Sequence, residues 1–330
     1  MGKERSKSID EKQGNGGGPY TNEAVGAENY GTISYMVESP QEKGVFYTGS
    51  DDGLVHITKD NGKTWNNITP KGIQQCLINA IEVSPHDAAT AYIATTRYKF
   101  NDYTPAIYKT TNYGESWVNI SANIPYGSFT RVVREDPIRK NLLYTGTEGG
   151  IYISWDGGKI WESIQLNLPK TPITDLKLHK DDLIVSTSGR GFWILDDVTL
   201  LSQYNKTKNS SVLYQPEVTY NGNWGSQLST TNSKFDGSSV LSGVNPAFGV
   251  VIYYELPKLA DSTEVVIEIL NSKKEIVRSF SSKKDKQLTL GDHKKAGGKM
   301  PTSKTNKILC KEMYDNASEA DVLRMPSTIP

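Results

Sequence analysis

The chain has 330 residues, and its 37 Lys and Arg balance its 37 Asp and Glu, so the formal net charge at pH 7 is zero. This balance leaves no basic surplus for nucleic acid or an anionic membrane, and no nucleic-acid partner is predicted. No apolar run in the sequence reaches the roughly 18 residues of a membrane span. The 18 Tyr, 6 Trp and 29 Gly are typical of many short strands joined by tight turns.

The N-terminal segment, residues 1–25, is rich in charge and glycine and is predicted to be flexible. It contains no apolar h-region, so it does not have the pattern of a secretory signal. An apolar run that ends at a proline follows at 33–40, and a strand of small residues at 45–50. A third strand at 54–58 leads into the stretch "TKDNGKTW" (58–65), and a fourth run closes the unit.

This order of four strands recurs along the chain. The stretches "TTNYGESW" (110–117) and "SWDGGKIW" (154–161) share the frame S/T-x-D/N-x-G-x-x-W with the first stretch. A fourth unit begins at 173 and ends near 197, and it lacks the frame. Four short strands per repeat of about 45 residues predict the blades of a β-propeller, whereas β-helix repeats are much shorter. The prediction is an all-β fold with four four-stranded blades over residues 26–198.

The frame residues are interpreted as structural, because a catalytic role would need one privileged copy and three equivalent copies are present. The Asp or Asn side chain can accept backbone N–H groups and close a turn. The glycine supplies a positive φ, and the Trp ring packs the hairpin onto its blade. The frame residues are Thr58, Asp60, Gly62, Trp65, Thr110, Asn112, Gly114, Trp117, Ser154, Asp156, Gly158 and Trp161.

These frames resemble the Asp-box, and the chain resembles the BNR/Asp-box repeat propellers, which include sialidases, xyloglucan-active glycosidases and the sortilin propeller. It is more closely similar to large bacterial proteins labelled "glycosyl hydrolase, BNR repeat" or sortilin-like. The stretches that carry the resemblance are 26–65, 130–154 and 189–197. The resemblance implies a secreted or periplasmic location. Members carry several blades before the segment that matches Gly26, so N-terminal blades or another chain are expected as partners.

The C-terminal part is predicted to contain a second module. Residues 199–211 are polar and are interpreted as a linker. Strand-like runs follow over 212–282, with a hairpin turn at 271–274, and the resemblance implies a fibronectin III-like β-sandwich there. Residues 283–330 are Lys- and Gly-rich at first and are predicted to be mostly disordered.

A ligand site is expected on the propeller face that carries the loops between the second and third strands of each blade. These loops are 50–53, 96–105, 147–150 and 188–191, and the second carries an insertion of about seven residues, a length that often marks a binding loop. The ligand-binding candidates on this rim are Arg97, Tyr98, Tyr103, Arg190, Asp51, Asp52 and Glu148.

Each candidate has a plainer alternative. The long loop can simply cover a neighbouring blade, Arg190 can pair with Asp196 or Asp197, and the acids can be ordinary turn residues. Arginines for a sialidase-type triad are present, but no pattern ties three of them together. Cys76, Cys310 and four scattered histidines form no metal-ligand spacing, and neither a metal nor a cofactor is predicted.

The sequence is compatible with three functional hypotheses. The first is a non-catalytic propeller module that binds carbohydrate or protein. The second is a fragment of a glycoside hydrolase, sialidase- or xyloglucanase-like, whose remaining catalytic residues lie on blades outside this chain. The third is a split gene product with no independent function. No catalytic residue is assigned.

Overall fold

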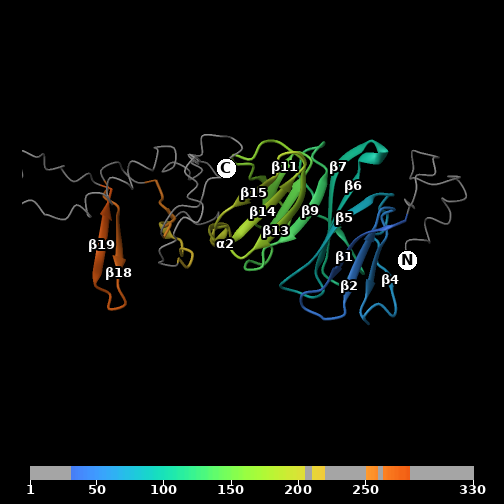
Figure 1. Cartoon of the computed structure of the whole chain (residues 1–330), viewed down its shortest axis with the longest axis horizontal. Coiled ribbons are helices and arrows are strands. Elements are labelled where there is room, and N and C mark those ends of the chain that lie inside the picture. The colour runs from blue at the N-terminus through green and yellow to red at the C-terminus, as the bar shows by residue number, and fades with distance from the viewer. Residues whose placement is uncertain (1–30, 205–209, 220–249, 259–262, 283–330) are drawn as a thin grey trace, which may run out of the picture. The chain divides into compact units, whose positions relative to one another are not determined.

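A computed structural model describes residues 31–204, 210–219, 250–258 and 263–282 (Figure 1). The expectations for residues 1–25 and for the 283–330 tail lie outside these described residues. Within them, all regular elements are strands except two short helices, the 3-10 helix η1 (Tyr98–Phe100) and α2 (Thr199–Gln203). The predicted all-β character is therefore confirmed.

Three four-stranded antiparallel sheets follow one another along the chain. The first sheet contains β1 (Ile33–Glu38), β2 (Phe46–Ser50), β3 (Val55–Thr58) and β4 (Asn66–Asn67). The second sheet contains β5 (Leu77–Val83), β6 (Ala91–Arg97), β7 (Asp102–Thr110) and β8 (Val118–Asn119). The third sheet contains β9 (Thr130–Glu135), β10 (Leu143–Thr147), β11 (Gly150–Ser154) and β12 (Glu162–Ser163). Each strand pairs with the next in sequence, an up-and-down order that is consistent with propeller blades.

The fourth sheet differs from the prediction of four strands. It contains only β13 (Ile173–His179), β14 (Asp182–Thr187) and β15 (Phe192–Leu195) among the described residues. This unit lacks the frame that reverses the chain after a third strand. The chain instead enters α2, inside the predicted linker, and Val198 there is buried and donates its N–H to the Asp181 carbonyl at 2.6 Å.

The four sheets pack through their inner strands. β1, β5, β9 and β13 contact one another in that order, so the first strands lie side by side. The second strand of one sheet also comes very close to the first strand of the next. A Cβ on Gly49 or Gly146 would lie 2.4 Å or 2.5 Å from the side chain of Ile78 or Ile173, so only glycine fits at these two contacts.

The remaining strands form two small antiparallel pairs. β16 (Val212–Leu213) pairs with β17 (Tyr254–Glu255), and β18 (Val266–Leu270) pairs with β19 (Ile276–Ser281). The hairpin predicted at 271–274 is confirmed, since Lys274 donates its N–H to the Asn271 carbonyl at 2.9 Å. The chain divides into compact units at Pro257, which places the two pairs in different units. A fibronectin III-like sandwich is not shown.

Candidate functional site

The three frames form the same turn after the third strand of their sheets. In the first, the Thr58 hydroxyl donates to Asp60 Oδ1 at 2.8 Å, and Asp60 Oδ1 accepts the Thr64 N–H at 2.9 Å. Hydrogen bonds from Thr64 lower the pKa of Asp60 to about 2, the opposite of what a general acid at neutral pH needs. The Gly62 N–H binds Thr58 Oγ1 at 2.9 Å, and the glycine has a φ of 84°.

The other two frames repeat this geometry. The Thr110 hydroxyl donates to Asn112 at 2.9 Å, and the Ser154 hydroxyl donates to Asp156 at 2.8 Å. The glycine N–H groups of both frames bind these hydroxyls at 2.9 Å. Equal geometry with Asp or Asn supports the structural interpretation of the frame.

The frame tryptophans differ in what they contact. Trp117 Nε1 donates to the Ile68 carbonyl of the first sheet at 2.7 Å. Trp161 Nε1 donates to the Ile120 carbonyl of the second sheet at 2.6 Å. Trp65, in the first sheet, donates to its own Gly62 carbonyl at 3.0 Å. The second and third tryptophans therefore join each sheet to the preceding one.

The inserted loop 96–105 carries an aromatic cluster that includes two of the predicted site residues. The Tyr98 ring stacks on Phe129 with centroids 5.7 Å apart, and Tyr103 lies 6.1 Å from the same ring. Tyr126 meets Tyr103 edge-on at 6.3 Å. Phe129 is 5% exposed, whereas Tyr98, Tyr103 and Tyr126 are 40%, 37% and 70% exposed. We call these four residues the aromatic rim.

Arg97 directly precedes Tyr98 of the aromatic rim, and two of its nitrogens have acceptors within the chain. Its Nε pairs with Asp102 Oδ2 at 2.9 Å, and Nη1 donates to the Gln75 carbonyl at 2.6 Å. The guanidinium also lies over the Phe100 ring, 5.2 Å from the centroid. Asp102 and the Gln75 carbonyl hold the guanidinium within the chain, and the pairing of Arg97 with a ligand carboxylate stays a prediction.

The two neighbouring acids of loop 50–53 have different environments. Asp51 accepts the N–H groups of Gly31 at 2.7 Å and Thr32 at 2.9 Å, and burial raises its pKa above the ordinary value. Asp52 is 0% exposed and accepts the Ser50 hydroxyl. The Asp52 carboxylate is therefore held inside the loop, and its role in ligand binding stays a prediction.

Glu148 is joined to the aromatic rim by an arginine. Arg131 donates from Nε and Nη2 to Glu148 Oε2, at 2.9 Å and 2.7 Å. The Arg131 guanidinium lies 5.2 Å from the centroid of the Phe129 ring. Both charged side chains are about one-third exposed, so this ion pair forms a polar flank of the rim.

Arg190 stands apart from the other candidates. Its backbone N–H binds Thr187 Oγ1 at 3.1 Å, and its carbonyl accepts Trp193 Nε1 at 3.0 Å. The side chain is exposed and forms no ion pair with any other described residue, so the proposed pairing with Asp196 or Asp197 is not present. It lies on the fourth sheet, and no contact within the described part of the chain links it to the aromatic rim.

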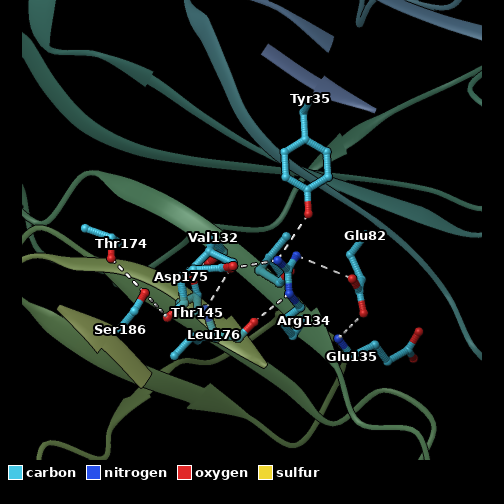
Figure 2. A network of polar contacts seen from close by, with 11 residues as sticks. Tyr35, Glu82, Val132, Arg134, Glu135, Thr145, Thr174, Asp175, Leu176 and Ser186 are labelled. Atoms are coloured by element: carbon cyan, nitrogen blue, oxygen red, sulfur yellow. Dashed lines mark hydrogen bonds and ion pairs between the residues drawn. The ribbon is translucent and has the colours of Figure 1, made fainter. Parts of the chain in front are cut away.

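A second polar network joins the inner strands of all four sheets. Arg134, on β9, donates to Asp175 Oδ1 at 2.7 Å and to the Leu176 carbonyl at 2.8 Å, both on β13. It also donates to the Tyr35 hydroxyl on β1 at 3.2 Å and to Glu82 on β5 at 3.4 Å. Figure 2 shows Arg134 between Glu82 on one side and Asp175 with Leu176 on the other.

The Arg134 network leaves little for a ligand to bind. The arginine is 8% exposed, and its nitrogens already donate to several acceptors. Burial raises the pKa of Glu82 to about 7, although the Arg134 charge acts in the opposite direction. This network therefore holds the inner strands together, and the aromatic rim is the better candidate for a binding site.

Phe129, Tyr126 and Arg131 were missed in the sequence, although they complete the rim. They lie in or directly after the connection from the second sheet to the third, and Gly127 there donates its N–H to the Tyr103 carbonyl at 3.1 Å. The topology of a propeller places such connections on the same face as the second-to-third-strand loops. That topology was the signal that could have found them.

No group of three or more metal-binding side chains occurs in the parts of the chain that the structure describes. The same residues contain no helix with the length and apolar character of a membrane span.

Comparisons with known proteins give partial matches at low identity. No protein-family model matches the chain, and no curated protein does. Among solved structures it is similar to YCF48 bound to D1 peptide, at 19% identity and a TM-score of 0.39, over 50% of this chain and 50% of that chain. It is also similar to the GH74 xyloglucanase from Xanthomonas campestris, at 18% identity and a TM-score of 0.40, over 50% of this chain and 29% of that chain.

A third similar structure is the GH74 enzyme from Niastella koreensis, at 17% identity and a TM-score of 0.41, over 57% of this chain and 31% of that chain. The chain thus spans half or less of the length of these three proteins. Likenesses of this size leave the function to be argued from the residues of the chain itself.

Proposed function

We propose that the chain is a non-catalytic binding module, built from propeller blades, that takes a carbohydrate or protein ligand on the aromatic rim. The observation that carries this proposal is the gathering of three exposed tyrosines around one buried ring. Tyr98 and Tyr103 come from the inserted loop, and Tyr126 comes from the next connection. The inserted loop and this connection together present exposed aromatic rings that contact one another.

The chemistry of this surface fits binding. Tyrosine rings offer large contact area at a low cost in conformational entropy, and each hydroxyl adds a hydrogen bond. The ion pair Arg131–Glu148, whose guanidinium lies against Phe129, and the ion pair Arg97–Asp102 of the inserted loop supply polar groups. A buried aromatic centre with a polar border is the usual composition of a protein interface, and exposed rings also stack on sugars.

The carboxylates of this face support binding over hydrolysis. A glycosidase needs two carboxyl groups facing a substrate roughly 5 to 10 Å apart. Asp52 is buried, Asp51 accepts two backbone N–H groups, and Glu148 is held by Arg131. These three acids are all engaged in structural contacts.

The test is a screen of the intact chain on glycan and peptide arrays, with xyloglucan oligosaccharides included, followed by titration of the strongest binder. The Tyr126→Ala and Tyr98→Ala variants are expected to weaken that binding about tenfold or more, as loss of interface aromatics does. Tyr254→Ala, which removes a tyrosine that is 38% exposed on β17, is the matched control and should bind as the parent does. Release of reducing sugar from any glycan, or equal binding by all three variants, would contradict the proposal.

A further inference from the structure

The outer edge of β15 differs from the corresponding edges in the other sheets. The third strands β3, β7 and β11 each pair with a two-residue fourth strand. In the fourth sheet, no strand of the described residues pairs with β15 on the side away from β14. An unpaired edge presents backbone donors and acceptors to which another strand can be added.

The third sheet shows what normally occupies this edge. Trp161 stands directly before β12, and its indole N–H binds the Ile120 carbonyl of the preceding sheet at 2.6 Å. Asn123 holds the backbone of the same tryptophan: its Nδ2 donates to the Trp161 carbonyl at 2.7 Å, and its Oδ1 accepts the Trp161 N–H at 3.1 Å. A tryptophan that leads into a strand is thus clamped at both its ring and its backbone.

The residues Ile164 and Asn167 beside β15 are equivalent to Ile120 and Asn123, but no tryptophan of the described residues binds them. Ile164 follows β12 as Ile120 follows β8, and each donates its N–H to the third strand of its sheet, at 3.1 Å and 2.8 Å. In sequence, Ile164-Gln-Leu-Asn167-Leu-Pro repeats the order of Ile120-Ser-Ala-Asn123-Ile-Pro. Neither the Asn167 amide nor the Ile164 carbonyl has a hydrogen bond to another residue in the described part of the chain.

A pocket beside β15 is lined by Ile164 and Asn167, the equivalents of the two residues that hold the third-sheet tryptophan. Its lining includes Ile151, Ile164, Asn167 and Leu168 from the third sheet. From the fourth sheet it includes Val185 on β14 and three residues of β15, Trp193, Ile194 and Leu195. Apolar walls together with one free amide match the surroundings that the third-sheet tryptophan has.

The negative charge at the C-terminal end of β15 favours a basic residue in the incoming segment. Asp196 and Asp197 follow the strand, and Asp182 and Glu217 lie within electrostatic range of them. In an antiparallel addition, the residues that precede the incoming tryptophan lie at this end of β15. Lys63 and Lys159 stand two positions before the tryptophan in two of the frames, so a basic residue there is compatible with the fold.

We propose that the β15 edge and its pocket accept an extended segment of another protein, with the pattern basic–x–Trp–x–Asn/Ser–aliphatic, as a fourth strand. The tryptophan fills the pocket and donates to the Ile164 carbonyl. The Asn167 amide holds its backbone, and the basic residue meets the carboxylates at the end of β15. This site shares no residue with the aromatic rim, so it stands or falls independently of the function proposed above.

The test uses a labelled peptide of sequence KTWNNIT, which is residues 63–69 of the chain, titrated with the intact protein and followed by fluorescence anisotropy. Saturable binding is expected. The same peptide with Ala in place of Trp is expected to bind about tenfold or more weakly, since it loses the ring and the indole hydrogen bond. Equal binding of both peptides would overturn the proposal.

Two protein variants locate the site. Asn167→Ala removes the free amide, and Ile194→Pro removes an N–H from the open edge, because Ile194 corresponds to Ile153, which pairs with β12. Each is expected to weaken the peptide about fivefold or more, while Ile194→Val keeps the N–H and the affinity. Circular dichroism confirms that each variant is folded, and Val118→Ser, at an exposed valine of β8, should leave peptide binding unchanged.

Other occupants give different results. A stable dimer by light scattering that excludes the peptide would mean that a second copy covers β15, which overturns the proposal. The sequence also contains Trp224, outside the described residues, and binding that occurs only after Trp224→Ala would mean that the chain fills its own pocket, which overturns the proposal as well. Undiminished binding to both Asn167→Ala and Ile194→Pro would place the peptide elsewhere.

Discussion

At the scale of single residues, one buried arginine connects the four inner strands. Arg134 binds Asp175 and Leu176 on β13, Glu82 on β5 and the Tyr35 hydroxyl on β1, and it is 8% exposed. Removing one partner of a buried ion pair leaves the other charge desolvated without compensation, which is usually a larger loss than the pair itself was worth.

Arg134→Met is therefore expected to lower the free energy of unfolding by about 3–5 kcal/mol. Urea denaturation followed by circular dichroism measures this change. The double variant Arg134→Met with Glu82→Gln should recover part of the loss, because it leaves no unpaired carboxylate. A loss below about 1 kcal/mol would show that the network is not a stabilising one.

Glu82 also makes stability depend on pH. Its folded-state pKa of about 7 lies above the ordinary 4.5, so the folded protein binds this proton more tightly than the unfolded chain does. The stability that the proton contributes is fully present below pH 4.5 and is lost as the pH rises through 7. Urea denaturation at about pH 5 and about pH 8 should show this decrease, and Glu82→Gln should reduce it. Glu148→Gln is the control, and an equal pH dependence in Glu82→Gln would contradict the assignment.

At the scale of elements, the frame is a hairpin turn whose tryptophan has a different partner in the first sheet. Trp161 and Trp117 bind carbonyls of the preceding sheet, and Trp161 is 3% exposed. Trp65 binds a carbonyl of its own turn. We therefore expect the frame tryptophans of the second and third sheets to stabilise the fold more than the frame tryptophan of the first sheet does.

Trp161→Ala is expected to lower the free energy of unfolding by about 3–5 kcal/mol, as the loss of a buried aromatic ring does. Trp65→Ala is the matched control within the chain and should cost well under half of that. Equal losses in thermal or urea unfolding would show that the inter-sheet hydrogen bond contributes nothing beyond the turn.

The elements were largely predictable from the sequence, and the site only in part. The period of the frame located three of the four strand sets, and the fourth sheet, which lacks the frame, has no return strand among the described residues. The hydrogen bonds of Arg97 could not be predicted, because one of its acceptors, the Gln75 carbonyl, lies on the connection between the first and second sheets. Asp51 and Asp52 could not be distinguished either, since only the local turn decides which carboxylate is buried.

At the scale of the whole array of sheets, the outer face of the fourth sheet carries exposed apolar side chains that no described element covers. Phe192 and Ile194 correspond in strand register to Ile151 and Ile153 of the third sheet. The third-sheet residues are 4% and 0% exposed, whereas Phe192 and Ile194 are 81% and 57% exposed. An apolar sheet face of this kind is normally covered by a further element or another chain.

The purified chain is therefore expected to self-associate through this sheet face as its concentration rises, while the β15 edge stays open to the KTWNNIT peptide. Light scattering with and without the peptide measures this. The double variant Phe192→Ser with Ile194→Ser should shift the association to higher concentration by about tenfold. Val118→Ser, which removes a valine that is 64% exposed on β8, is the control and should have little effect. A parent chain that stays monomeric at every concentration would contradict this expectation.

The tryptophan contacts between sheets all run in one direction along the chain. The acceptors Ile68 and Ile120 precede Trp117 and Trp161 in sequence, by about one repeat in each case. On the ribosome, each acceptor has therefore emerged before the indole that needs it. The tryptophan of each of these turns contacts only a sheet that has been synthesised earlier, so the sheets can be added one at a time during synthesis. At each step, the exposed surface is that of the last sheet to emerge.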